Sequence, residues 1–115
     1  MHECTRACIA YIAGTLVNNA SSGEIYDYSQ EKYVKFSGSV KRNHVCILDH
    51  ERGTYITGAI SNLYDFYRGS SVSLSVKGNK IHGHDYGDRH EYGGIIDGNR
   101  VNIHYDDKVF SYVLA

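Results

Sequence analysis

The chain has 115 residues, a formal net charge of −1 and an isoelectric point near 6.6. This length fits one domain, residues 1–115, and excludes most two-domain enzymes. The balanced charge provides no overall attraction to nucleic acid or to an anionic membrane, and no stretch reaches the roughly 18 apolar residues of a membrane helix.

Residues 3–18 are predicted to form an amphipathic N-terminal helix. Apolar side chains recur there at spacings of three and four residues, which places them on one stripe of a helix: Cys4, Cys8, Tyr11, Ile12 and Leu16. An isolated helix of this length is marginal in water, so we expect it to cover the apolar face of a sheet or an open end of one. Gly14 interrupts the helix and indicates a close approach to that sheet.

Residues 24–115 form a degenerate repeat in which an aspartate with aromatic or histidine neighbours recurs at intervals of roughly 20 residues. The repeated aspartates are Asp27, Asp49, Asp65, Asp85 and Asp106. A second turn signal lies between successive aspartates, for example Gly78-Asn79 and Gly98-Asn99. Each unit therefore predicts two strands and two turns, and each aspartate is expected to accept hydrogen bonds from the turn that it opens.

Alternation within the repeat separates the two faces of the predicted sheet. The apolar face consists of Val34, Phe36, Val40, Val45, Ile47, Ile56, Ile60, Val72, Leu74, Val76, Val101 and Ile103. The opposite face consists of Tyr33, Lys35, Ser37, Tyr55, Thr57, Ser73, Ser75, His82, His84, Asn102 and His104. One face is thus expected in the core and the other in solvent.

The sequence predicts a mainly β (α+β) fold, in which the helix precedes an antiparallel meander of about 8–10 short strands built from hairpin repeats. So long a meander is expected to close into a barrel or to fold into a two-layer sandwich, because open twisted sheets of that size seldom persist. The stretch Tyr86 to Asn99, with Tyr92-Gly93-Gly94 before Asp97-Gly98-Asn99, is similar to the glycine- and tyrosine-rich hairpins of the MORN family. That resemblance implies hairpin architecture and no function.

A histidine cluster is the densest polar motif of the chain. In a hairpin that turns at Gly87-Asp88, His84 would lie opposite Glu91. The residues His82, His84 and Glu91 would then share one face, as ligands of zinc, nickel or copper do. A metal protein or metal-dependent enzyme centred on these residues and His90 is the alternative to a solvated strand face.

Other chemistry has weaker signals. The aspartates could act as paired carboxylates in glycoside cleavage, but a residue repeated in every unit favours a structural role. The only basic cluster, which includes Lys32 and Arg42 near Tyr33, is diluted by Glu31, so nucleic acid is not expected as a partner. The three cysteines, Cys4, Cys8 and Cys46, cannot all pair within one chain, which favours a reducing, cytoplasmic location. Cys46 is expected to be buried.

The sequence therefore predicts a small, non-enzymatic β-repeat module that binds a partner through a face rich in tyrosine and histidine. The expected contact residues are Tyr33, Lys35, Tyr55, His82, His84 and His104. The partner, a protein or a small molecule, is not specified by the sequence. No cofactor and no membrane association are expected, and self-association through free strand edges is a third hypothesis.

Overall fold

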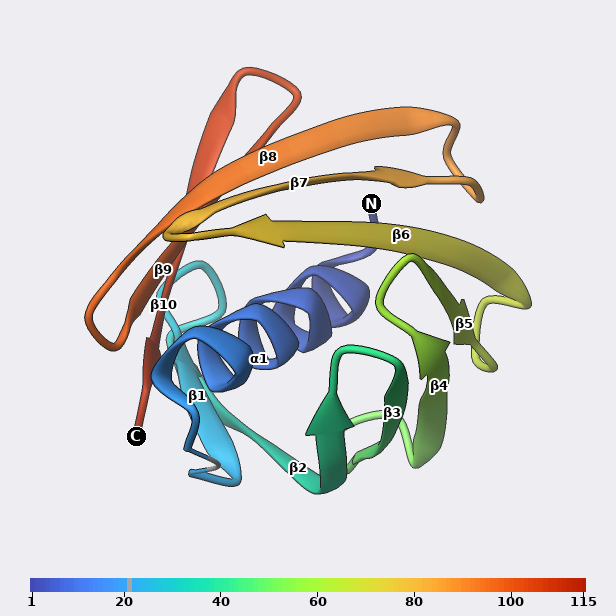
Figure 1. Cartoon of the computed structure of the whole chain (residues 1–115), viewed down its shortest axis with the longest axis horizontal. Helices are drawn as coiled ribbons and strands as arrows, with labels where there is room; N and C mark the ends of the chain where they lie inside the picture. Colours follow the sequence, from blue (N-terminus) through green and yellow to red (C-terminus); the bar gives the residue numbers. More distant parts are fainter. Residues whose placement is uncertain (21) are drawn as a thin grey trace.

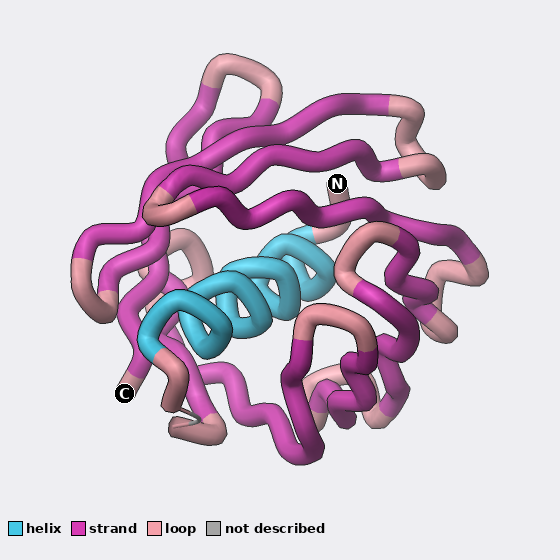
Figure 2. Tube along the Cα trace, in the orientation of Figure 1, coloured by secondary structure: helices cyan, strands magenta, loops and turns pink. Residues whose placement is uncertain are grey.

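Ten strands form a closed antiparallel barrel around a single helix in the computed structural model, which describes residues 1–20 and 22–115 (Figures 1 and 2). The elements are α1 (Glu3–Asn18), β1 (Glu24–Asp27), β2 (Lys32–Lys41), β3 (His44–Asp49), β4 (Thr54–Ala59), β5 (Asn62–Asp65), β6 (Ser70–Lys77), β7 (Lys80–Asp85), β8 (His90–Asp97), β9 (Arg100–Tyr105) and β10 (Lys108–Leu114). The predicted helix and the long antiparallel meander are confirmed.

Closure of the barrel depends on the first strand. Each strand pairs with its neighbours along the chain, and β1 pairs with both β2 and β10. Within β1, Ile25 lies opposite Val34 on one side and Leu114 on the other. Of the two closures that the sequence allows, the chain therefore adopts the barrel, and every strand has a neighbour on each side.

The helix lies inside the barrel, where the cyan helix of Figure 2 is encircled by magenta strands. Every residue from Cys4 to Thr15 is buried, so the helix is enclosed around its whole circumference. The expectation that it covers the apolar face or an open end of the sheet is therefore wrong. The reason is geometric: eight strands enclose a lumen that side chains fill, whereas ten enclose a wider one. A helix without a charged residue from Ala7 to Val17 fills that space.

Strand side chains that point inward pack against this helix, as the alternation predicts. All twelve residues assigned to the apolar face are core residues or, for Val40, packed against the core. The ring of Phe36 stacks on Tyr11 of the helix with 4.7 Å between ring centroids. The Gly14 position is as tight as expected, since a Cβ there would lie 2.4 Å from Cδ1 of Leu114.

Turns at the two ends of the barrel differ. At the end that holds the N-terminus of α1, the turns after β1, β3, β5 and β7 have four residues each, and the fourth has a positive φ: Glu31, Gly53, Gly69 and Arg89. The fifth turn at this end contains only Asp106 and Asp107, both with positive φ, as in a type I′ hairpin. Asp106 therefore lies one position beyond its strand and is exposed, so its assignment to the aspartate repeat is wrong.

The remaining four aspartates are equivalent. Each is the last residue of its strand and each is buried: Asp27, Asp49, Asp65 and Asp85. We call these four residues the aspartate rim.

In the described part of the chain, no helix is long and apolar enough to cross a membrane.

Candidate functional site

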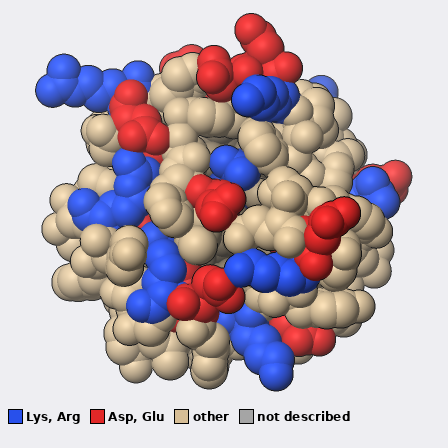
Figure 3. Space-filling view, turned by 180° about the vertical axis from the view of Figure 1, so that it is seen from behind, with Lys and Arg blue, Asp and Glu red and all other residues tan. Residues whose placement is uncertain are grey.

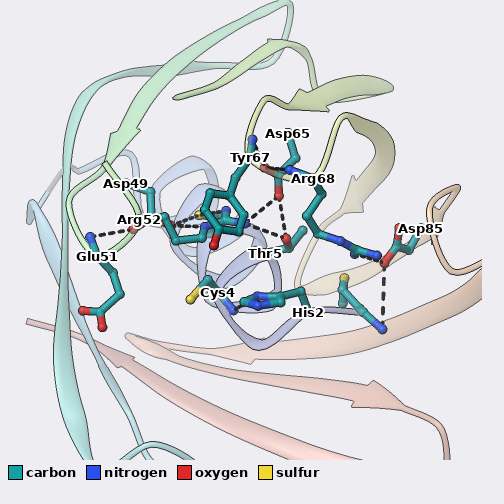
Figure 4. A network of polar contacts seen from close by, with 12 residues as sticks. His2, Cys4, Thr5, Asp49, Glu51, Arg52, Asp65, Tyr67, Arg68 and Asp85 are labelled. Atoms are coloured by element: carbon teal, nitrogen blue, oxygen red, sulfur yellow. Dashed lines mark hydrogen bonds and ion pairs between the residues drawn. The ribbon is translucent and has the colours of Figure 1, made fainter. Parts of the chain in front are cut away.

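The aspartate rim uses its carboxylates in two directions. In each residue Oδ1 accepts a hydrogen bond from the backbone N–H two residues later, at 2.9 to 3.0 Å. These are the turn contacts that the sequence predicts for a strand-ending aspartate. In Asp49, Asp65 and Asp85 the second oxygen, Oδ2, contacts side chains of the helix or of another hairpin, so these three carboxylates also join a larger network (Figure 4). Oδ2 of Asp27 accepts a hydrogen bond from Gln30 within its own turn.

Arg52 links two hairpins of this network. Its Nε donates to Asp49 at 2.7 Å and its Nη1 donates to Asp65 at 3.0 Å, while only 5% of its side chain is exposed. Thr5 of the helix donates to Asp65 at 2.6 Å, and the Cys8 thiol donates to Asp49 at 3.7 Å. The planar guanidinium fork thus ties two neighbouring hairpins and the helix together, a geometry that lysine cannot reproduce.

Arg68 occupies the equivalent position one hairpin further along, but both carboxylates that its guanidinium contacts belong to the following hairpin. It donates to Asp85 at 3.1 Å and to Asp88 at 2.8 Å. The amino group of Met1 lies 2.5 Å from Asp88 and 3.8 Å from Asp85. Hydrogen bonds from that amino group and from Arg68 outweigh the effect of burial and lower the pKa of Asp88 to about 2.

Burial and charge set the protonation of the central groups. Burial alone raises the pKa of Asp65, but the hydrogen bond from Thr5 and the charge of Arg52 outweigh it and hold that pKa below its usual value. Burial, followed by the charge of Asp49, raises the pKa of the Cys8 thiol well above its usual range. The network therefore combines ionised carboxylates with a protonated thiol, which is an unreactive form of cysteine.

These carboxylates are poor candidates for catalysis because a substrate cannot reach them. Asp27, Asp49 and Asp85 have no exposed surface, and Asp65 is 1% exposed. Each accepts hydrogen bonds on both of its oxygens. A general acid or base needs access to the reacting group, so the rim can link hairpins but cannot attack a glycosidic bond.

The six predicted contact residues all lie on the outer surface, but in three separate places. Tyr33 and Lys35 lie on β2, Tyr55 lies on β4, and the three histidines His82, His84 and His104 lie on β7 and β9. Strand β3 separates the first two places, and β5 and β6 separate the second from the third. The barrel therefore divides the predicted face into a part on β2, a part on β4 and a histidine part on β7 and β9.

The histidine part has the pairing that the sequence predicts. His84 lies opposite Glu91, and His82 lies opposite Gly93, which in turn lies opposite His104. Gly93 has no side chain, so it leaves a gap between His82 and His104. The His84 ring packs against the Tyr86 ring, with 4.6 Å between ring centroids. Within residues 1–20 and 22–115, no three His, Cys, Asp or Glu side chains come together as a metal site would require.

A neutral outer surface on β3 to β6 was not recognised from the sequence. The outward residues of β3 to β6 include His44 and the charged Lys77 at strand ends. We define the β3–β6 face by eight outward residues between those ends: Cys46, Leu48, Tyr55, Thr57, Tyr64, Phe66, Ser71 and Ser73. None of them is charged, and Phe66 and Tyr55 are 58% and 50% exposed. Cys46 is half-buried on this face, so the expectation that it is buried in the core is wrong: its neighbours Val45 and Ile47 point inward.

This face contains an apolar groove of about 460 Å³ lined by Cys46, Thr54, Tyr55, Thr57 and Phe66. The ring of Phe66 packs edge-on against Tyr64 at 4.8 Å between centroids, which holds it at the groove margin. Elsewhere charges are frequent and mixed in sign. On the side shown in Figure 3, Lys and Arg side chains lie interspersed with Asp and Glu side chains.

Comparison with known proteins gives no relatives. No protein-family model matches the chain, and neither a curated protein nor a solved structure matches it.

Proposed function

We propose that this protein is a non-enzymatic β-repeat module that binds a protein partner through the β3–β6 face. The observation that carries the proposal is the neutral aromatic groove beside Phe66. Exposed aromatic side chains with few charges are typical of the centre of protein interfaces. Tyr55, one of the predicted contact residues, lies at the centre of this face, and Tyr33 and the histidines lie outside it.

The scaffold suits recognition because its helix and its hairpin turns are held together by many contacts. The helix fills the lumen, and the aspartate rim ties neighbouring hairpins to it. A surface on such a scaffold does not need to be ordered when a partner binds, which lowers the entropic cost of association. A nucleic acid fits this face poorly, because the face has no lysine or arginine to neutralise phosphates. We also propose a cytoplasmic location, supported by three unpaired cysteines.

Peptide selection followed by substitution tests the proposal. Random peptides displayed on phage are selected against the protein immobilised at low density, and their affinities are then measured in solution by fluorescence polarisation. We expect the Phe66→Ser and Tyr55→Ser variants to weaken binding by at least about 10-fold, as truncation of a buried aromatic anchor does.

The Tyr33→Ser variant is the matched control, because Tyr33 is an equally exposed tyrosine, at 59%, on another part of the barrel. Its affinities should stay within about twofold of those of the wild type. The proposal fails if selected peptides bind all three variants equally, or if the Tyr33 variant alone loses binding.

A further inference from the structure

Exposed lysines and arginines gather at the end of the barrel opposite the aspartate rim. Four of them form what we call the basic cluster: Lys41, Arg42, Lys77 and Lys80. Arg42 joins its two parts, since it follows β2 and its Nη1 donates to the backbone carbonyl of Val76 on β6 at 3.2 Å. Among the described residues, none of the four has a salt-bridge partner. The positive charge of the cluster is therefore available to another molecule.

Two lysines of the cluster repel each other. Lys77 on β6 and Lys80 on β7 are exposed and lie directly opposite each other across their turn. Like charges in such a cross-strand pair destabilise a sheet. Lysines often protect a free strand edge, but β6 and β7 each have two neighbours in the closed barrel, so there is no edge to protect. The pair therefore costs stability and gives the sheet nothing in return.

The next turn at this end shows that the fold does not require two lysines. The turns Gly78-Asn79 and Gly98-Asn99 occupy equivalent places, and their glycines have φ values of 60° and 59°. The residues that flank the second turn are Asp97 and Arg100, which pair with opposite charges. Proteins accept such local departures from stability at functional sites, so we interpret the two lysines as binding residues.

The dipole of the central helix does not explain the cluster. Cations are favourable near a helix C-terminus, but the effect falls off within the last turn, and the last turn of α1 has no basic residue. The turn between β8 and β9 contacts this end of α1 directly, because Asn18 donates to the carbonyl of Gly98 at 3.0 Å. That turn contains the acid–base pair, and the two lysines lie on another turn.

The basic cluster borders the β3–β6 face. His44 lies opposite Lys41 and two positions from Cys46, which lines the apolar groove. Two positions along a strand span about 7 Å, so an extended segment of two or three residues reaches from the groove to the cluster. On β6, Lys77 ends the outward row that contains Ser73. One partner segment can therefore contact the groove and the cluster together.

We propose that the partner of the β3–β6 face is an acidic peptide segment, which places an apolar side chain in the groove and Asp or Glu side chains against the basic cluster. This inference rests on the function proposed above and names the chemistry of its partner. Complementary charge speeds encounter and fixes the orientation of the bound segment. Nucleic acid fits less well, because its phosphates repeat along the strand, whereas the basic residues are confined to one end of the face.

Peptides selected on the immobilised protein provide the test. Those whose binding depends on Phe66 should carry Asp or Glu on one side of an apolar residue. Replacement of these acids by Asn or Gln should weaken binding roughly 3- to 20-fold, as expected for two or three exposed ion pairs. The double variant Lys77→Gln, Lys80→Gln should weaken binding by a similar factor at about 50 mM salt and hardly at about 500 mM, because salt screens exposed charges.

The double variant Arg89→Gln, Lys108→Gln is the matched control, because it removes the same charge from two exposed residues at the rim end. Its affinities should stay within about twofold of those of the wild type. A single variant, Lys77→Asp, gives the turn the charge pattern of Asp97 and Arg100. It should raise the urea midpoint of unfolding, because it makes a repulsive pair attractive, and it should weaken peptide binding.

Several results would overturn the inference. These are selected peptides without acidic residues, binding that the loss of Lys77 and Lys80 leaves unchanged, or an equal loss in the control. Tighter binding of single-stranded oligothymidylate or of phosphatidylserine vesicles, abolished by the same double variant, would assign the cluster to another anion. Peptides without acids that still depend on Phe66 would keep the proposed function, whereas peptides that bind without Phe66 would refute both. Circular dichroism of each variant checks that the barrel is intact.

Discussion

Thr5 of the central helix donates a hydrogen bond from its hydroxyl to Oδ2 of Asp65 on the barrel rim, at 2.6 Å. The same carboxylate opens the turn after β5 and accepts from Arg52. One aspartate therefore connects the helix, its own hairpin and the preceding one. The rim carboxylates also surround the N-terminus of α1, where the helix dipole favours negative charge.

Removal of the Arg52 guanidinium should be costly. The Arg52→Met substitution leaves Asp49 and Asp65 buried without their cation, and we expect a loss of about 3 to 5 kcal/mol in the free energy of unfolding. Chemical denaturation monitored by circular dichroism measures it. Arg52→Lys keeps the charge but reaches only one carboxylate well, so it should recover part of the loss.

The exposed pair of Lys32 and Glu51 is the control for this prediction. It has a short distance of 2.6 Å, but both side chains are about 40% exposed. Lys32→Met should leave the denaturation midpoint almost unchanged, because solvent screens such pairs. Equal effects of the two substitutions would show that the rim network does not stabilise the barrel.

Two threonines of the helix should respond in opposite ways to valine, which has nearly the same shape. Thr5→Val removes the hydrogen bond to Asp65, and we expect a loss of about 2 kcal/mol. The Thr15 hydroxyl is buried and has no hydrogen-bond partner among the described residues. Thr15→Val should therefore stabilise the protein by about 1 kcal/mol. The melting temperatures of both variants, compared with that of the wild type, test these two expectations. A Thr15→Val variant that melts at a lower temperature than the wild type would contradict the burial of an unpaired hydroxyl.

Gly14→Ala should destabilise the protein although alanine is the better helix former by about 1 kcal/mol. The added Cβ would lie 2.4 Å from Leu114 Cδ1 and 3.1 Å from Val101 Cγ2, and overpacking of this kind costs about 1 to 3 kcal/mol. Leu114→Val removes the nearest atoms. The double variant should consequently be more stable than Gly14→Ala alone, and a simple sum of the two single effects would refute the clash.

Asp65 should make stability depend on pH in the acidic range. Because its pKa is lowered in the folded state, its contribution is present above the unfolded pKa of about 4 and is lost as the pH falls through the folded value. Between those two values the free energy of unfolding should fall by up to about 1.4 kcal/mol per pH unit. Asp65→Asn should flatten this slope.

Asp106→Asn is the control for the pH dependence, since Asp106 is exposed in the two-residue turn outside the rim. Urea denaturation at a series of pH values below 5 should give curves for this variant that follow those of the wild type. A steep slope retained by Asp65→Asn would assign the acid sensitivity to another group.

Local patterns predicted most of the fold. Alternation in Val72, Leu74 and Val76 identified the inward face, and the aspartates before turns identified hairpin ends. The position of the helix was missed although a signal existed. The stripe from Cys4 to Leu16 suggested one apolar side, but residues 7–17 contain no charged residue at all, and a helix that is uncharged all round belongs inside a structure.

The contacts of the aspartate rim and the arrangement of the outer surface were harder to predict from sequence patterns. Arg52 and Asp65 are 13 positions apart, and their contact exists only because successive hairpins lie side by side on a curved wall. Sequence patterns place a residue on a face but do not measure the curvature that separates Tyr33 from His82. The neutral surface around Phe66, in contrast, could have been found by checking outward positions for the absence of charge.

The pairing of β1 with β10 has a consequence for how the chain reaches its folded state. The helix is synthesised before any strand, yet its surroundings are complete only when residues near 114 have been made. Until then the uncharged part of the helix, residues 7–17, is not fully enclosed. The pairing of β1 with β10, which completes the enclosure, joins segments separated by most of the chain. Contacts of such long sequence separation form slowly. Removal of β10 would therefore do more than delete one strand: it would open the wall along its full height and give water access to the helix.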